Sequence, residues 1–210
     1  VDVAGFYQSE EKAYNHFNGI WRAGFNIQNL GPKISYDNDE FNTNFLPANL
    51  KIGTGFDFIF DEDNKLAVNL ELNKLLVPTP QNPDLNGDGT VTPEEYTQNY
   101  NNYRKTGWVS GLLKSFGDAP NGFSEELKEI TYALGSEYVY KDSFAVRAGY
   151  FHESPVKGAR QYFSLGAGFK YTTAKIDVSY LFSSSKIRNP LENTLRFSLT
   201  FNFGDNYGIN

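Results

Sequence analysis

The sequence predicts an all-β protein, an antiparallel transmembrane β-barrel with one long extracellular loop that contains short helices. Three observations lead to this fold class. Hydrophobic residues alternate with polar or small residues along many segments. Several of these segments reach or exceed the roughly 9 to 11 residues that a tilted strand needs to cross a bilayer. Short turns join neighbouring segments, as in antiparallel hairpins.

About eight segments follow this pattern, and turns such as DEDN (residues 61–64) and KDS (residues 141–143) connect them. In chain order they lie near residues 21–30, 50–60, 65–73, 132–140, 144–150, 162–171, 176–182 and 195–203. The last segment alternates without a fault, because Leu195, Phe197, Leu199, Phe201 and Phe203 share one face. We therefore expect an antiparallel meander.

The second face of these strands is rich in glycine. A face that meets open water normally carries Lys, Glu and Thr. Glycine in a strand instead indicates close approach by other groups, as in a crowded polar barrel interior. A soluble barrel or sandwich remains the alternative. The glycines on this face are Gly24, Gly53, Gly55, Gly135, Gly149, Gly166 and Gly168, and the aromatic residues suited to membrane interfaces are Trp21, Tyr36, Tyr138, Tyr140 and Tyr171.

Composition excludes several classes of function. The net charge is -6 and Lys and Arg form no cluster, so we expect no nucleic-acid partner. No window approaches the roughly 18 to 20 apolar residues of a membrane helix. Cysteine is absent, and the two histidines, His16 and His152, lie far apart in the sequence. Neither a metal-protease motif nor a catalytic triad can be assembled, and we expect no enzyme.

Residues 78–126 interrupt the strands of what we expect to be a single domain over residues 1–210. Barrels of this kind have short periplasmic turns and long outer loops, so this insert is predicted to be extracellular. Its apolar stretch WVSGLLKSF is able to pack, and FSEELKEI is predicted to form a short helix. The candidate partner-binding residues are Trp108, Leu112, Phe116 and Phe123; the alternative is that the apolar residues only cover the barrel.

The stretch DLNGDGTVTPEE (residues 84–95) matches the pattern D-x-[DN]-x-[DN]-G-x5-E of a calcium loop. Gly89 permits the sharp turn, and Thr92, Pro93 and Glu95 begin a helix with a capping box. No helix enters the loop, so it cannot act as a two-helix sensor and we expect a structural Ca²⁺. The alternative is a turn without metal. The predicted ligands are Asp84, Asn86, Asp88, the Thr90 carbonyl, Thr92 directly or through water, and a bidentate Glu95.

Six segments resemble, in order, the C-terminal half of the PorV family, outer-membrane proteins of the bacterial type IX secretion system that are similar in fold to the FadL transporters. They are NLGPKISY, FLPANLKIG, LNKLLVPTP, SFGDAPNGFSEELKEITYALGSEYVY, FAVRAGYFHESPVKGARQYFSLGAGFKY and NPLENTLRFSLTFNF. The resemblance runs from about Trp21 to the end. It implies a 14-stranded FadL-type barrel with a plugged lumen, so about eight strands indicate a chain that is incomplete at its N-terminus.

The resemblance also implies a function and a location. Such a protein lies in the lipid of the bacterial outer membrane, contacts the translocon barrel and binds the C-terminal signal domain of secreted cargo. It carries the cargo to the machinery that attaches it to the cell surface, without catalysis. The calcium loop is not a feature of the family as a whole. Two other functions remain open, a FadL-type channel for small hydrophobic molecules and a soluble calcium-binding β domain.

Overall fold

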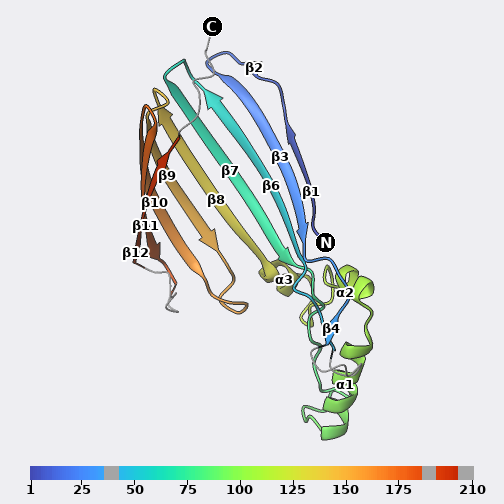
Figure 1. Ribbon diagram of the computed structural model, residues 1–210. Coiled ribbons are helices and arrows are strands. Elements are labelled where there is room, and N and C mark those ends of the chain that lie inside the picture. The colour runs from blue at the N-terminus through green and yellow to red at the C-terminus, as the bar shows by residue number, and fades with distance from the viewer. Residues whose placement is uncertain (36–42, 186–192, 203–210) are drawn as a thin grey trace. The chain divides into compact units, whose positions relative to one another are not determined.

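The computed structural model describes residues 1–35, 43–185 and 193–202 (Figure 1), and in these residues the chain is predominantly antiparallel β-sheet. The predicted all-β class is confirmed. The long strands are β3 (Asn18–Gln28), β6 (Asn49–Ile59), β7 (Asn64–Leu75), β8 (Ile130–Tyr140), β9 (Phe144–His152), β10 (Gln161–Tyr171), β11 (Ala174–Ser183) and β12 (Thr194–Phe201). Tyr36 and Phe203 lie outside the described residues.

The eight predicted segments all form strands, and the sequence reasoning missed four shorter ones. These are β1 (Val3–Gln8), β2 (Lys12–Ala13), β4 (Ile34–Ser35) and β5 (Thr43–Asn44). Within the described residues the main sheet follows the order β1-β3-β6-β7-β8-β9-β10-β11-β12, with β2 beside β3, while β4 and β5 form a separate pair. Apart from β2, the main-sheet strands are therefore neighbours in chain order, as a meander requires.

The turn between β8 and β9 explains why KDS joins two strands. Lys141 and Asp142 both have positive φ, at 53° and 48°. The Ser143 N–H donates to the Tyr140 carbonyl at 3.1 Å, which closes a β-turn with Lys141 and Asp142 as its central residues. Positive φ at both central positions is the type I′ geometry, whose twist matches that of antiparallel strands.

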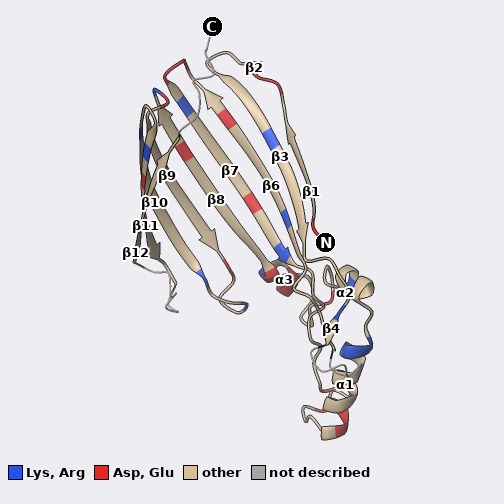
Figure 2. Ribbon diagram, viewed as in Figure 1, with Lys and Arg blue, Asp and Glu red and all other residues tan. Residues whose placement is uncertain are grey.

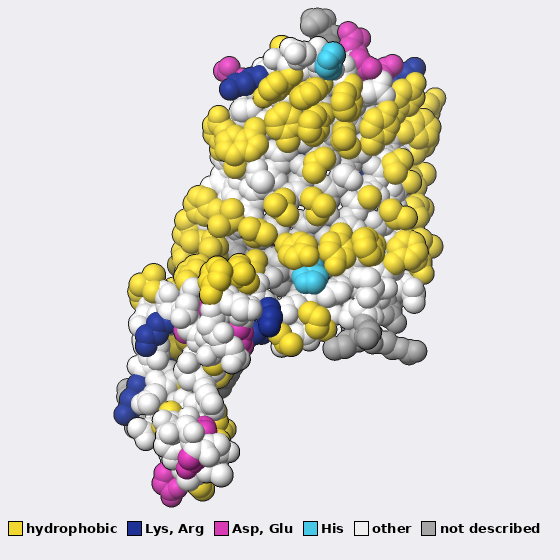
Figure 3. Space-filling view, turned by 180° about the vertical axis from the view of Figure 1, so that it is seen from behind, with side chains coloured by type: hydrophobic (Ala, Val, Ile, Leu, Met, Phe, Trp, Pro, Cys, Tyr) yellow, Lys and Arg dark blue, Asp and Glu magenta, His cyan; other side chains and the backbone are white. Residues whose placement is uncertain are grey.

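The exposure of the strands is the inverse of that in a soluble sheet. On β10, Phe163 and Leu165 are 51% and 53% exposed, whereas Gly168 on the opposite face is buried. Val146 on β9 and Leu134 on β8 are likewise exposed. Figure 3 shows hydrophobic side chains gathered over the strands. A soluble sheet would bury such a face against a second layer, so this face suits a nonpolar surrounding.

Arginine side chains reach across a neighbouring strand on the polar face. Arg147 on β9 pairs with Glu137 on β8, and its Nη1 donates to Asp177 Oδ1 on β11 at 2.7 Å. The second contact passes over β10 at Gly168, where a Cβ would lie 2.6 Å from Asp177 Oδ1. Figure 2 shows how few charged residues the strands carry. Arg147 therefore joins its neighbouring strand β8 and also β11, which is not adjacent to β9.

The same arrangement recurs in the strands near the N-terminus. Arg22 on β3 donates to Asp57 on β6 at 2.5 Å and to Asn69 on β7 at 3.1 Å. A Cβ at Gly55 on β6 would collide with the Asn69 side chain. The expectation that glycines permit close approach is confirmed at Gly55 and Gly168. It is wrong for Gly135, where nothing lies within 4 Å of an added Cβ.

The described chain divides into two compact units. One comprises residues 1–5, 24–52 and 72–131, and includes the whole insert; the other comprises residues 6–23, 53–71 and 132–210. Among the described residues, no helix has the length and apolarity needed to span a membrane.

Candidate functional site

The insert connects β7 to β8 and contains all the helices of the described chain. They are α1 (Pro93–Lys105), α2 (Trp108–Lys114), α3 (Phe123–Glu126) and a 3-10 helix (Leu127–Glu129). The predicted helical start at Thr92 and the predicted helix in FSEELKEI are confirmed. No helix precedes α1 within residues 76–92, so the calcium-type loop has a leaving helix only.

The loop of residues 84–95 has the backbone of a tight turn around Asp84. Gly87 and Gly89 adopt positive φ of 75° and 84°, which L side chains rarely adopt. These two glycines donate their N–H groups to Asp84 Oδ1 at 2.8 Å and Oδ2 at 2.9 Å. The glycine pattern of the sequence therefore folds the chain around the first predicted ligand.

The next two predicted ligands also accept hydrogen bonds from the loop. Asn86 Oδ1 accepts from the Asp88 N–H at 2.9 Å, and Asp88 Oδ1 accepts from the Thr90 N–H at 2.8 Å. The hydroxyl of Thr90 donates to the same oxygen of Asp88. These hydrogen bonds, led by that of the Thr90 side chain, lower the pKa of the Asp88 carboxyl below its ordinary value.

The twelfth residue of the loop, Glu95, closes the loop and caps the helix. Its Oε2 accepts from the Thr92 N–H at 3.0 Å, while the Thr92 hydroxyl oxygen accepts from the Glu95 N–H at 3.2 Å, which completes the capping box. Its Oε1 accepts from the Asn86 N–H at 3.2 Å. The hydrogen bond from the Thr92 backbone is the main cause of the lowered pKa of the Glu95 carboxyl.

The oxygen atoms that this loop offers as ligands are of the chemical types that calcium binds. Three carboxylates, an amide oxygen and a backbone carbonyl are the hard oxygen ligands that Ca²⁺ takes. The three carboxylates are engaged by loop N–H groups, and in the described residues no group of three or more His, Cys, Asp or Glu side chains is placed to hold a metal ion. To bind an ion, Asp84, Asp88 and Glu95 would therefore have to give up their hydrogen bonds from loop N–H groups and turn their carboxylate oxygens toward one centre.

Helix α1 has no buried residue and is held by a few contacts, with the rest of the insert and with residues 33 and 45. The Asn99 side chain donates to the Gln81 carbonyl at 2.9 Å. The Tyr103 ring meets the Phe45 ring edge-on at 5.3 Å, and Lys33 donates to the Arg104 carbonyl at 2.5 Å. A helix held by so little buried surface depends on its cap and on these contacts.

A buried ion cluster fixes the other end of the insert to β7. Lys74 Nζ donates to Glu126 Oε1 at 2.7 Å and to Glu129 Oε2 at 2.9 Å, and all three side chains are at least 87% buried. The Thr79 hydroxyl donates to Glu129 at 2.9 Å, and the Ala119 N–H donates to Glu126 at 3.2 Å. The strand end, the start of the insert and its last helices thus share one polar network.

The four candidate partner-binding residues differ in exposure. Phe123 is 77% exposed and Phe116 is 51% exposed, so each presents an aromatic ring to the surroundings. Trp108 and Leu112 on α2 are half-buried. Leu113, at 71%, is the most exposed residue of this helix among the large hydrophobic ones. Phe123 and Leu113 are therefore the most exposed large hydrophobic residues of the insert.

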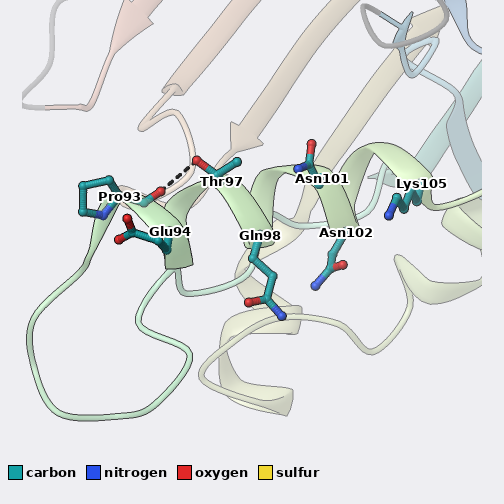
Figure 4. Close-up of a pocket in the computed structure, with 7 residues that line it drawn as sticks. All are labelled: Pro93, Glu94, Thr97, Gln98, Asn101, Asn102 and Lys105. Carbon is teal, nitrogen blue, oxygen red and sulfur yellow. Dashed lines mark hydrogen bonds between the residues drawn. The ribbon is translucent and has the colours of Figure 1, made fainter.

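Two cavities open beside α1. The first, of about 570 Å³, follows one side of the helix, where Figure 4 shows Asn102, Gln98 and Lys105 among the side chains that line it. The second, of about 700 Å³, lies between α1 and residues 78–81 and 113–118. It is lined by Pro78, Thr79, Gln81, Asn99, Asn102, Tyr103, Thr106, Leu113, Lys114, Phe116, Gly117 and Asp118.

Asp118 stands out in the lining of the second cavity. Its Oδ2 accepts from the Thr79 N–H at 3.0 Å, whereas its buried Oδ1 has no hydrogen-bond partner in the described part of the chain. Burial raises the pKa of the Asp118 carboxyl, and the nearby charges of Glu126 and Glu129 raise it further. Burial raises the pKa of the Tyr103 phenol, and the Asp118 carboxylate raises it further.

Sequence reasoning missed the ion cluster, the second cavity and the role of Asp118. Lys74 falls on the same face of β7 as Leu66, Val68, Leu70 and Leu72, so it departs from the alternating pattern of its strand, but nothing in that pattern shows that Glu126 and Glu129 return to it. Such pairs depend on contacts between residues about 50 positions apart, which a single sequence does not reveal.

The fold and the insert together define a class of protein: an antiparallel β-sheet protein whose strands expose an apolar face and whose β7–β8 connection is a long loop that contains helices. Residues 1–82 match the family model described as PorV, Type IX secretion system protein PorV. Over these residues the resemblance to the PorV family is confirmed, and this family is a component of the type IX secretion system. The resembling segments beyond residue 82 lie outside the match. No curated protein matches the chain.

Proposed function

We propose that this chain is a non-enzymatic outer-membrane component of the type IX secretion system, which binds the C-terminal signal domain of cargo and passes it from the translocon to the surface-attachment machinery. The match of residues 1–82 to the PorV model carries the secretion role. The outer-membrane location rests on the exposed apolar face of the strands, exemplified by Phe163 and Leu165. The insert, with Phe116 and Phe123 exposed, is the surface proposed to meet cargo.

The proposal makes the apolar face a lipid contact and the insert an extracellular loop. Removing the exposed apolar side chains of several strands from water at once would stabilise the protein, because each buried Leu or Phe contributes about 1.5 to 3 kcal/mol. An arginine at the bilayer midplane costs about 2 to 4 kcal/mol, whereas the same charge near an interface costs about 0 to 1 kcal/mol. Most charges on the described strands accordingly occupy the polar face, as Arg147 does, whereas Lys74 near the end of β7 lies on the apolar face and is paired with Glu126 and Glu129.

The first experiment is isolation of the natural full-length protein from its outer membrane in mild detergent. We expect it in the outer-membrane fraction, together with a translocon barrel protein and secreted proteins that retain their C-terminal domains. Recovery from the soluble fraction, or recovery from the membrane with none of these partners after crosslinking, would refute the proposal.

A FadL-type channel for hydrophobic molecules is the competing function. The polar face of the described strands disfavours it, because charged pairs of Arg22 and Arg147 cross that face and would meet a passing acyl chain. Uptake of a fluorescent fatty acid by vesicles containing the full-length protein, above that of protein-free vesicles, would favour the channel instead.

We further propose that residues 84–95 bind a structural Ca²⁺ through Asp84, Asn86, Asp88, the Thr90 carbonyl, Thr92 and Glu95. The completeness of the motif and the positive φ of Gly87 and Gly89 support this proposal. When bound, the ion would neutralise the carboxylates and draw them to one centre, which would stiffen the loop that leads into α1.

Calorimetric titration of the metal-stripped protein with CaCl₂ tests the calcium proposal directly. We expect one ion per chain in the wild type, and a large loss of affinity in Asp84→Asn and Glu95→Gln. Asp142→Asn, an exposed carboxylate in a different turn, is the matched control and should leave the affinity unchanged. Equal titration curves for the wild type and for both loop variants would refute the site.

A further inference from the structure

The second cavity of the insert has the size and the chemical lining of a binding site. Its volume of about 700 Å³ lies within the roughly 300 to 1,000 Å³ of ligand pockets in proteins. One wall is apolar, formed by Leu113, Phe116 and Pro78, and the opposite wall carries the carboxamides of Asn99 and Asn102. This pairing of an apolar wall with a few polar groups selects ligands that contain both kinds of surface.

The charges in the lining disfavour an ionic ligand. Asp118 and Lys114 carry opposite charges, so the cavity has no net charge. Lys74, which could neutralise further acidic groups, is already bound to Glu126 and Glu129. A neutral ligand that offers hydrogen-bond donors as well as acceptors therefore fits the cavity better than an anion or a cation.

The carboxamides favour a peptide over a lipid. A side-chain amide presents one acceptor and two donors, which complement the C=O and N–H of a peptide group. Asn99 and Gln81 already use N–H donors on carbonyls of the insert. The Asn102 side chain forms no hydrogen bond within the described residues and lines the cavity. An acyl chain would leave these groups unpaired, at the cost of desolvation.

The apolar wall offers a place for one side chain of such a peptide. Leu113, in the last turn of α2, is 71% exposed, and Phe116, just after the C-cap of this helix, is 51% exposed. Burial of a single aliphatic or aromatic side chain against them would remove apolar surface of both partners from water.

We propose that this cavity binds an extended peptide segment, with one apolar side chain against Leu113 and Phe116 and the peptide backbone paired with Asn102. The inference rests on the proposed secretion function, since the peptide would belong to the C-terminal domain of cargo. Because Asn99, Asn102 and Tyr103 lie on α1, the bound segment would also hold this otherwise weakly attached helix against residues 78–81.

Fluorescence anisotropy with labelled probes tests the site. The probes are the intact C-terminal signal domain of a protein secreted by the same system, and synthetic peptides of about 12 residues that tile this domain. The receptor is the full-length protein in detergent. We expect at least one peptide to compete with the intact domain.

Each variant of a cavity residue is compared with a control variant of a residue outside the cavity. Asn102→Ala should weaken binding about fivefold to tenfold, as expected for the loss of one or two hydrogen bonds. The adjacent Asn101→Ala, outside this cavity, is its control. Leu113→Asp should weaken binding about 10-fold to 100-fold, whereas Leu127→Asp, which is 53% exposed and outside the cavity, should have little effect. Both cavity residues are exposed, so these variants should fold.

The outcomes are distinguishable. If the intact domain binds the wild type and the Asn102 and Leu113 variants equally, the cavity is not the site, although the secretion function stands. If neither the domain nor any peptide binds the wild type, the secretion function fails and the inference fails with it. Competition by a fatty acid in place of peptides would also overturn the inference and would point to a lipid ligand.

Discussion

Gly168 makes room for the ion pair between Arg147 and Asp177, and its replacement by alanine tests this role. An added Cβ would lie 2.6 Å from Asp177 Oδ1 and 3.0 Å from Arg147 Nη1, well inside ordinary contact. One or both side chains must move, and the 2.7 Å contact between them would be lost. Gly135→Ala is the matched control, because it also lies within a strand and its Cβ would meet nothing within 4 Å.

The two substitutions should change the free energy of unfolding in opposite directions. Replacing a strand glycine by alanine stabilises by about 0.5 to 1 kcal/mol when there is space, mainly by restricting the unfolded chain. We expect this gain for Gly135→Ala. At Gly168 an overpacking cost of about 1 to 3 kcal/mol opposes the same gain, so we expect a net loss of about 0.5 to 2 kcal/mol.

Guanidinium unfolding of the protein in lipid vesicles, followed by tryptophan fluorescence, would measure both changes. The effect of Gly168→Ala should shrink when Asp177 is also replaced by alanine, because the clashing oxygen is then absent. Equal effects of the two glycine substitutions, or an undiminished loss in the Asp177→Ala background, would refute the close approach described for this face.

Three further predictions concern the insert. Lys74→Ala should lower the free energy of unfolding by about 3 to 5 kcal/mol, because two buried carboxylates lose their cation. Its control is Lys65→Ala, which removes an exposed pair with Asp142 and should change the free energy of unfolding by no more than about 1 kcal/mol in the same denaturation assay. Thr92→Ala removes the cap of α1 and should cost the helix about 0.5 to 2 kcal/mol, seen as faster hydrogen exchange of α1 amides with unchanged exchange in β10; equal exchange in both proteins would refute the cap. The raised pKa of Asp118 means that the folded state binds its proton more readily than the unfolded state, so stability should fall as pH rises from about 3.8 through the folded pKa; Asp118→Asn should flatten this part of the profile, and an unchanged slope would contradict the assignment.

The fold was largely predictable because its pattern is local. Alternation along β10 or β12 requires only neighbouring residues, and it located every long strand. The short strand β1 was missed because Val3–Gln8 has no sustained alternation. The turn at Lys141 and Asp142 was predicted, but its type I′ geometry was not, since neither residue is the Asn or Gly that usually marks it.

The backbone conformation of the loop of residues 84–95 could be predicted from the sequence, whereas the second cavity of the insert could not. Gly89 and the capping box are signals at fixed spacing, and each takes the conformation that the motif implies, whereas the positive φ of Gly87 was not predicted. The cavity beside Asn102 and Asp118 forms only where α1 and the end of α2 fold back on residues 78–81. Such an arrangement depends on tertiary packing, which the hydrophobic pattern of the insert does not specify.

Glu95 occupies a position in which two processes compete for one side chain. It holds the first turn of α1 through Thr92, and the proposed ion would require both of its oxygens. Occupancy of the loop by the proposed metal and the winding of the first helical turn would therefore be thermodynamically linked. If the loop binds calcium and the cavity binds a peptide as proposed, a drop in calcium concentration would alter the α1 wall of the cavity and so change how readily the insert engages its ligand.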